Sequence, residues 1–368
     1  MNIDLLGSLV SLLTFFGISA IIALSLNIEY GVAGIPNFGQ ALFVSLGAYT
    51  AGVTYTRLMP LLAGREALEP CGATNMAAAL ALRGQILKTM PAVALGNFAL
   101  TLLLAAVIGG VVGLIASYPA LRLKEEWFLG LVLLVGAETV RIIVRGWEPI
   151  ICAHNGLSGI TQPFGSLPTP QVRSFAFLGL VLVIMALAYW YSERLVRSPY
   201  GRLLKALREN NAVASGLGKD MTRVRGQVMV IGSAMAALAG VLFVTNIGFA
   251  SANDYGVALT LDIWVMIVLG GLGNMRGALL GALIVTLLDR FTSIAAIQFN
   301  MLGIDIEFNY VRYILFGIIL LLMLRFRPQG LWPEPRRTTK ANKVADKVAD
   351  KVADSLASPG QTAAQGGE

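Results

Sequence analysis

Long apolar runs separated by short polar segments dominate the chain. Two of the clearest, LLGSLVSLLTFFGISAIIALSLN at 5–27 and NFALTLLLAAVIGGVVGLIASY at 97–118, exceed the roughly eighteen apolar residues that cross about 30 Å of hydrocarbon. Backbone groups in lipid must be hydrogen-bonded internally, and these runs are far too long for barrel strands, so they are predicted to be helices. The pattern predicts nine membrane spans, at 5–27, 32–56, 91–118, 127–145, 174–191, 226–249, 256–272, 277–294 and 310–326.

Composition supports a membrane protein. Of 368 residues, 56% are hydrophobic and 13% are charged, whereas charged residues make up about a quarter of a typical soluble domain. We therefore expect an all-α integral membrane protein, a bundle of about nine transmembrane helices with broken or re-entrant segments.

Two glycine-rich stretches are predicted to interrupt helices. The segment GIPNFGQ at 34–40 contains two glycines and a proline, which cannot donate a backbone hydrogen bond. Discontinuous helices expose backbone groups to substrate in transporters, but small residues also serve helix packing in membranes, so both interpretations remain open. A second candidate break contains Gly270, Gly271, Gly273 and Gly277.

Basic residues gather on one predicted side of the membrane. Lys and Arg concentrate in the loop at 192–225 and in the tail, which places the N-terminus outside and the C-terminus in the cytoplasm. The expected organisation is a transmembrane domain at 1–326, a cytoplasmic loop at 192–225 within it, and a cytoplasmic tail at 327–368. The tail, with its KVAD repeats, is expected to be disordered. The net charge of +7 reflects these flanks and does not indicate nucleic-acid binding.

Polar residues inside the predicted spans are candidates for a transport pathway. Each costs several kcal/mol in hydrocarbon unless it faces a partner or water. Asn37 and Gln40 are the first candidates, and Asp262 is a further one. Glu138 and Arg141 lie three residues apart, so a structural ion pair on one helix face is the favoured interpretation. Two further candidates within spans are Asn27 and Asn246.

The two cysteines fall in the two large external loops. Cys71 lies in the loop at 57–90 and Cys152 in the loop at 146–173, where an oxidising environment would let a disulfide persist. A disulfide between them is one interpretation, and two unrelated small residues are the other.

No enzymatic constellation is recognisable. His154 is the single histidine, and the chain has no Cys-x-x-Cys, Gly-x-Ser-x-Gly or Walker A pattern. We therefore predict no enzyme, no cofactor and no metal. The chain has no motif for ATP hydrolysis, so transport would need a partner ATPase or an ion gradient. A secondary transporter or channel for a small neutral solute stays an alternative, and a membrane-embedded enzyme is a third class.

The loop GRLLKALRENNAVASGLGKD at 201–220 carries Glu209 followed by the small residues Ala212, Ala214 and Gly218. A basic cytosolic loop is common to many polytopic proteins. However, small residues allow another surface to approach closely, and the spacing resembles the cytoplasmic EAA loop of ABC importer permeases. The resemblance implies that these four residues contact the ATP-hydrolysing subunit.

The resemblance extends over about residues 20–330. SLNIEYGVAGIPNFGQALFVSLGAYTAG at 25–52 is similar to the N-terminal signature of branched-chain amino acid ABC permeases, and LRLKEEWFLGLVLLVGAETVRIIVRGWEP at 121–149 to a segment of their M-type subunit. VLGGLGNMRGALLGA at 268–282 follows the same pattern. The match is weaker at Glu126, Trp127 and Leu129, and in CAHNGLSGI at 152–160 only Asn-Gly-Leu and the following glycine agree.

The resemblance implies an M-type permease subunit in the cell (plasma or inner) membrane. Such a subunit would belong to an ATP-driven importer of branched-chain or similar neutral amino acids. Its expected partners are an H-type permease in a heterodimer, two cytosolic ATP-binding subunits, an extracytoplasmic solute-binding protein and membrane lipid. Related permeases for urea or other amides remain an alternative substrate class.

Overall fold

The computed structural model describes residues 5–72, 75–122, 126–209, 220–301 and 308–334. The chain divides into two compact units, Met1–Pro333 and Glu334–Glu368, and the architecture below belongs to the first.

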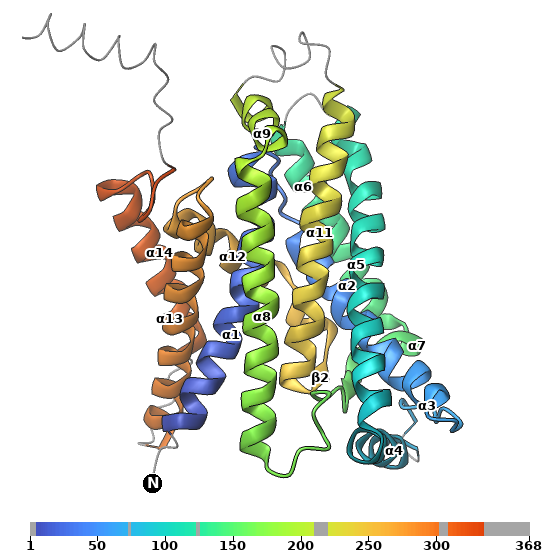
Figure 1. The fold of residues 1–368 in the computed structure, drawn as a ribbon. Helices are drawn as coiled ribbons and strands as arrows, with labels where there is room; N and C mark the ends of the chain where they lie inside the picture. The colour runs from blue at the N-terminus through green and yellow to red at the C-terminus, as the bar shows by residue number, and fades with distance from the viewer. Residues whose placement is uncertain (1–4, 73–74, 123–125, 210–219, 302–307, 335–368) are drawn as a thin grey trace, which may run out of the picture. The chain divides into compact units, whose positions relative to one another are not determined.

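The described part of the first unit is built almost wholly of helices, which confirms the predicted all-α membrane fold (Figure 1). Its α-helices are α1 (Leu5–Leu26), α2 (Gln40–Val53), α3 (Met59–Leu62), α4 (Met76–Thr89), α5 (Pro91–Arg122), α6 (Glu126–Gly146), α7 (Glu148–Ile151), α8 (Pro170–Arg197), α9 (Pro199–Glu209), α11 (Met221–Ile247), α12 (Val257–Gly270), α13 (Met275–Met301) and α14 (Phe308–Phe326).

Shorter elements join these helices. Two π-helical segments, η1 (Asn27–Val32) and η2 (Thr54–Leu58), continue α1 and α2, and two 3-10 turns are η3 (Ala153–Asn155) and η4 (Ala252–Tyr255). The strands β1 (Leu157–Ser158) and β2 (Phe249–Ala250) pair antiparallel, with Leu157 opposite Ala250.

The long helices α1, α5, α8 and α11 run lengthwise beside one another, and α11 packs against α5, α2 and α1 (Figure 1). Glycines allow α2 and α11 to touch backbone to backbone. A Cβ built on Gly47 would lie 1.9 Å from the Ala237 oxygen, and one on Gly240 would lie 1.9 Å from the Val44 oxygen. Small residues at such positions let membrane helices approach closely, so these two positions require glycine.

The predicted count of nine spans is not confirmed. Among the described residues, five helical stretches are long and apolar enough to cross a membrane. Helix α12 has 14 residues, which is about 21 Å and short of the roughly 30 Å of hydrocarbon. The span predicted at 32–56 combined the non-helical stretch 33–39 with α2, whereas the span predicted at 256–272 is close to α12 itself. The five stretches are Leu6–Val32, Pro91–Tyr118, Trp127–Gly146, Pro170–Arg197 and Met221–Ile247.

Both glycine-rich stretches interrupt helices. After η1 the chain leaves helical geometry and re-enters it at Gln40, and Gly34 has a φ of 75° in the left-handed region that favours glycine. The second break separates α12 from α13, with Gly271 at a φ of 117° and Gly273 at 78°.

The predicted loop at 192–225 is largely helical, and the start of the predicted tail is hydrogen-bonded to the bundle. Helix α8 extends to Arg197, α9 follows it, and α11 begins at Met221, so much of 192–225 is helical. Beyond α14, Leu331 N donates to the Leu269 oxygen at 3.0 Å and Trp332 N to the Gly270 oxygen at 2.9 Å. The first residues of the predicted tail therefore pack against the second break.

Cys71 and Cys152 are joined by a disulfide, with Cα atoms 5.0 Å apart. It ties the segment between α3 and α4 to the end of α7. Helices α3 and α4 lie at the opposite end of the bundle from α9 (Figure 1).

We predict that iodoacetamide labels neither cysteine until a reductant is added, and both afterwards, as mass spectrometry of the intact protein will show. The bridge closes a separation of 81 residues, for which chain entropy gives up to about 4.5 kcal/mol. The double variant Cys71→Ser/Cys152→Ser should lose less than this, because α5 and α6 within the loop stay restrained by the membrane. Labelling of both thiols without reductant would show that the bridge is absent.

Candidate functional site

A buried network of polar side chains surrounds the first break, which is the non-helical segment between η1 and α2. Asn37 lies at its centre, where its Nδ2 donates to Glu29 Oε2 at 2.8 Å and to Gln40 Oε1 at 2.9 Å. Its Oδ1 accepts from Gly39 N at 2.9 Å, an Asx turn that leads the chain into α2. Gln40 Nε2 in turn donates to Ser25 Oγ on α1. Asn37 thus joins both sides of the break.

The network is sealed from solvent within the chain. Asn37, Gln40, Glu29 and Ser25 are all 0% exposed. The structure therefore brings together the two predicted pathway residues Asn37 and Gln40, but in this conformation it places them in the interior and not along an open surface. Their role in a substrate route stays a prediction.

Glu29 belongs to this network, although sequence reasoning did not single it out. It lies beyond the predicted end of the first span at 27, so its burial was not evident, and η1 carries the helix on past it. In the described part of the structure its Oε1 is buried without a hydrogen-bond partner. Gly232 of α11 packs against it, since a Cβ built there would lie 2.1 Å from that oxygen. The carboxylate next to a predicted break was the signal that could have found it.

A second asparagine joins the two breaks to each other. Asn27 Nδ2 donates to the Asn274 oxygen at 3.1 Å, and Gly273 N donates to Asn27 Oδ1 at 3.0 Å. Asn274 Oδ1 accepts from Arg276 N at 3.0 Å at the start of α13, as Asn37 does before α2. Backbone groups freed by the second break are thus satisfied by a side chain of η1.

Helix α12 covers the first break from the outside. Trp264 Nε1 donates to the Asn37 oxygen at 3.2 Å, and its ring stacks on Phe38 with centroids 4.5 Å apart. Thr260 Oγ1 accepts from Ala41 N at 3.1 Å, one helical turn away. Asp262, the third predicted pathway residue, is partly exposed. The helical repeat turns it to the opposite side of α12 from Thr260 and Trp264.

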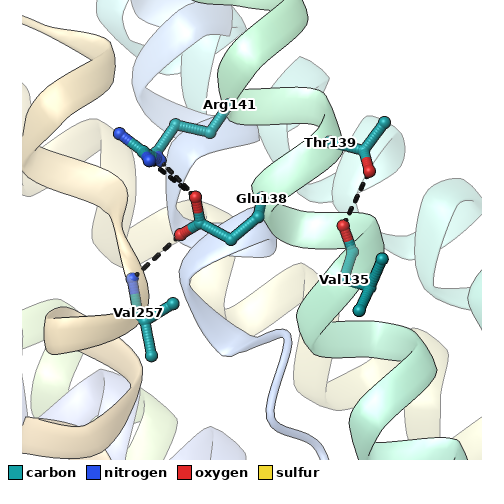
Figure 2. Close-up of polar contacts among 5 residues, drawn as sticks. All are labelled: Val135, Glu138, Thr139, Arg141 and Val257. Carbon is teal, nitrogen blue, oxygen red and sulfur yellow. Dashed lines mark hydrogen bonds and ion pairs between the residues drawn. The ribbon is translucent and has the colours of Figure 1, made fainter.

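The predicted pairing of Glu138 with Arg141 is present and has a further contact (Figure 2). Arg141 Nη2 lies 2.6 Å from Glu138 Oε2, and Arg141 Nε donates to the same oxygen at 2.7 Å. Glu138 Oε1 accepts from Val257 N at 3.1 Å, the first residue of α12. A carboxylate there satisfies a free N–H and complements the positive helix end. Sequence spacing indicated the pair but not this contact with a residue far along the chain.

The residues predicted to contact an ATPase are only partly described. Glu209 is the last residue of α9 and is exposed, whereas Ala212, Ala214 and Gly218 lie outside the described residues. Helix α9 is anchored by Leu204 and Leu207, which are 0% and 2% exposed. Among the described residues no group of three or more His, Cys, Asp or Glu side chains could hold a metal ion.

We predict that Asn37→Leu destabilises the fold by on the order of 3 kcal/mol or more, because Glu29 Oε2, Gln40 Oε1 and Gly39 N would lose partners in a dry interior. Thermal unfolding in detergent measures the change. The matched control is Asn253→Leu at an exposed asparagine, which should stay within about 0.5 kcal/mol of the parent. Equal effects of the two variants would contradict the assigned role of the network.

For the α12 cap, we predict that Glu138→Ala costs about 1–2 kcal/mol and Glu138→Gln less, since glutamine keeps an oxygen for Val257 N. Both side chains of the ion pair are about a quarter exposed, so the charge itself contributes little. The neighbouring Thr139→Val serves as the control, because Thr139 Oγ1 donates to the Val135 oxygen of its own helix at 2.8 Å (Figure 2). Equal stability of the alanine and glutamine variants would argue against a cap.

Comparison with known proteins gives matches along most of the chain. Residues 8–324 match the family described as "Branched-chain amino acid transport system / permease component". A probable branched-chain amino acid transport permease protein LivM of Methanocaldococcus jannaschii is 37% identical over 91% of this chain and 95% of its own length. The high-affinity branched-chain amino acid transport system permease protein LivM of Salmonella typhimurium is 26% identical over 90% of this chain and 71% of its own.

A third relative carries a different subunit name. The high-affinity branched-chain amino acid transport system permease protein LivH of Salmonella typhimurium is 23% identical over 86% of this chain and 91% of its own length. No solved structure matches the chain. Because the family match takes in both helix breaks, the asparagine networks and the contact of α6 with α12, the chain belongs to the family of branched-chain amino acid transport system permease components.

Proposed function

We propose that this chain is the M-type permease subunit of an ATP-driven importer that carries branched-chain or similarly neutral amino acids into the cell. The observation that carries the proposal is the family match over residues 8–324, together with the 37% identity to a relative named as a LivM permease. The two broken helices agree with it, because transporters build their solute routes from such segments.

The polar groups of the bundle favour a neutral substrate. A strongly anionic solute would call for a cation in the membrane without a carboxylate beside it, and Arg141 is bonded to Glu138 at 2.6 Å. A neutral amino acid needs apolar walls for its side chain and a few amides or helix ends for its charged groups. The described spans offer this combination.

The route involves Asn37, Gln40 and Asp262 in different ways. Asp262 is partly exposed on α12, whereas Asn37 and Gln40 lie behind Trp264 in the closed network. For Asn37 and Gln40 to reach solute, the break between η1 and α2 must open during transport. This conformation is therefore one in which the first break is shut.

We further propose that a second, H-type permease packs on the face shared by α6 and α12. Glu138 lies about 18 Å along α6 from Glu126, within the span, and its side chain is 26% exposed. An ion pair that is about a quarter exposed at that depth is costly against lipid and tolerable against protein or water. Large apolar side chains beside it are exposed too, with Val135 at 65% and Ile142 at 63%.

Two cytosolic ATP-binding subunits and an external solute-binding protein complete the proposed importer. The N-terminus lies outside and the C-terminus in the cytoplasm in this proposal, so α9 faces the cytosolic ATPases. The concentration of Lys and Arg in 192–225 supports that orientation. The disulfide-linked segments then lie outside the cell membrane, where a disulfide persists.

We predict that vesicles containing the complete complex of both permeases and the ATP-binding subunits, supplied with the binding protein, accumulate labelled leucine in the presence of ATP. Labelled urea and glutamate should not accumulate. Asn37→Leu should lower leucine uptake by more than its loss of assembled complex explains, if this residue lines the route.

The controls separate the alternatives. Omission of the binding protein or of ATP should abolish uptake, and uptake that persists without the ATPases would indicate a secondary transporter or channel. Transport of urea or glutamate with none of leucine would overturn the proposed substrate. Unchanged uptake by correctly assembled Asn37→Leu would assign Asn37 to packing alone.

A further inference from the structure

The last turn of α9 touches the first helix break directly. Arg208 Nη1 donates a hydrogen bond to the Gly31 oxygen in η1. Gly34 lies against the same residue, since a Cβ built on Gly34 would be 2.9 Å from Arg208 Cγ and 3.2 Å from Arg208 Cα. Figure 1 shows α9 as a short helix at one end of α8 and α11. The contact therefore joins that short helix to the interior of the bundle.

A cation suits this position for physical reasons. The last carbonyls of a helix have no donors within the helix and carry its negative end. The N–H groups of the three residues that follow η1 donate to earlier carbonyls of η1. The Gly31 carbonyl instead accepts a hydrogen bond from the guanidinium of Arg208. The bonds to earlier carbonyls are Ala33 N to Ile28 O, Gly34 N to Tyr30 O and Ile35 N to Glu29 O.

The segment that Arg208 holds is connected to both breaks. Gly31 packs on Asn27, because a Cβ built on Gly31 would lie 2.1 Å from Asn27 Oδ1, and Asn27 bonds to Gly273 and Asn274 in the second break. Glu29 in the same π-helical segment accepts from Asn37 in the first break. A displacement of α9 at Arg208 thus acts on a single connected set of buried hydrogen bonds.

We propose that Arg208 is the positioning residue that transmits motion of α9 to the two broken helices, and so couples ATP hydrolysis to opening of the route. This inference rests on the proposed function as an ATP-driven importer. The ATPase moves α9, Arg208 carries the movement to the Gly31 carbonyl, and η1 passes it on through Glu29 and Asn27. The contact directly joins the helix proposed to face the ATPases to the buried segment η1.

The chain offers a matched control on the same helix. Arg202 is exposed, as Arg208 is, and lies six residues earlier in α9. The structure gives Gly31 and Gly34 their contacts with Arg208. Arg208→Gln and Arg202→Gln remove the same charge from the same helix, and only the first removes the link to the break.

The first experiment measures leucine import and ATP hydrolysis on the same vesicles, with the complete complex and its binding protein. For Arg208→Gln we expect the leucine imported per ATP hydrolysed to fall about tenfold, within the usual range of coupling between sites. The ATPases should still co-purify in full amount. Arg202→Gln should keep the parent ratio, and Arg208→Lys, which retains the charge, should recover part of it.

A second readout does not depend on the substrate. Amide hydrogen exchange of residues 27–40 in the complete complex should respond to ATP in the parent protein and lose that response in Arg208→Gln, while residues 199–208 still respond. A role in holding the fold alone would raise exchange with and without ATP and leave the import ratio unchanged.

The outcomes are separable. A parent complex that imports no amino acid rejects the proposed function, and the exchange response of 27–40 still decides the role of Arg208. An unchanged import ratio or an unchanged exchange response in Arg208→Gln overturns the inference. So does failure of both Arg208→Gln and Arg208→Lys to assemble with the ATPases, because the residue would then serve docking or folding.

Discussion

The structure depends on the need to satisfy backbone polar groups where a helix is interrupted inside a membrane. Lipid offers no hydrogen bonds, so an unpaired N–H or C=O costs several kcal/mol there. At the first break Asn37 accepts from Gly39 N while it holds Glu29 and Gln40. At the second, Asn27 and the segment after α14 supply the missing partners. Asn37 and Asn27, together with Arg208 at the Gly31 carbonyl, thus stabilise the discontinuous helices of this bundle.

Local chemistry made part of this predictable. The break at 34–40 follows from glycine and proline, whose backbone preferences act on their immediate neighbours, and the pairing of Glu138 with Arg141 follows from helical spacing. The number of spans did not follow, because the apolar run at 32–56 contains a non-helical stretch before α2 and because α12 is too short to cross the hydrocarbon. Apolar length alone cannot show where a run stops being helical.

The candidate site was harder to predict because its partners are distant in the chain. Asn27 bonds to a residue 247 positions later, and Arg208 to one 177 positions earlier. Glu29 was missed although it lies next to a predicted break, and the contact of Glu138 with Val257 was not foreseen. A single sequence identifies which residues are costly to bury, but the partner that satisfies each one becomes visible only in three dimensions.

The backbone hydrogen bonds from Leu331 and Trp332 to the end of α12 have a consequence for the synthesis and membrane insertion of the protein. Their N–H groups bond to the carbonyls of Leu269 and Gly270, some sixty residues earlier. Asn27 is inserted with the first helix, but its side-chain oxygen accepts its hydrogen bond only when the turn at Gly273 has formed. During synthesis the first hydrophobic segment therefore enters the membrane with a polar side chain whose partner is made 246 positions later. Until the turn at Gly273 has formed, that side chain needs water, a translocon wall or a chaperone as a temporary partner.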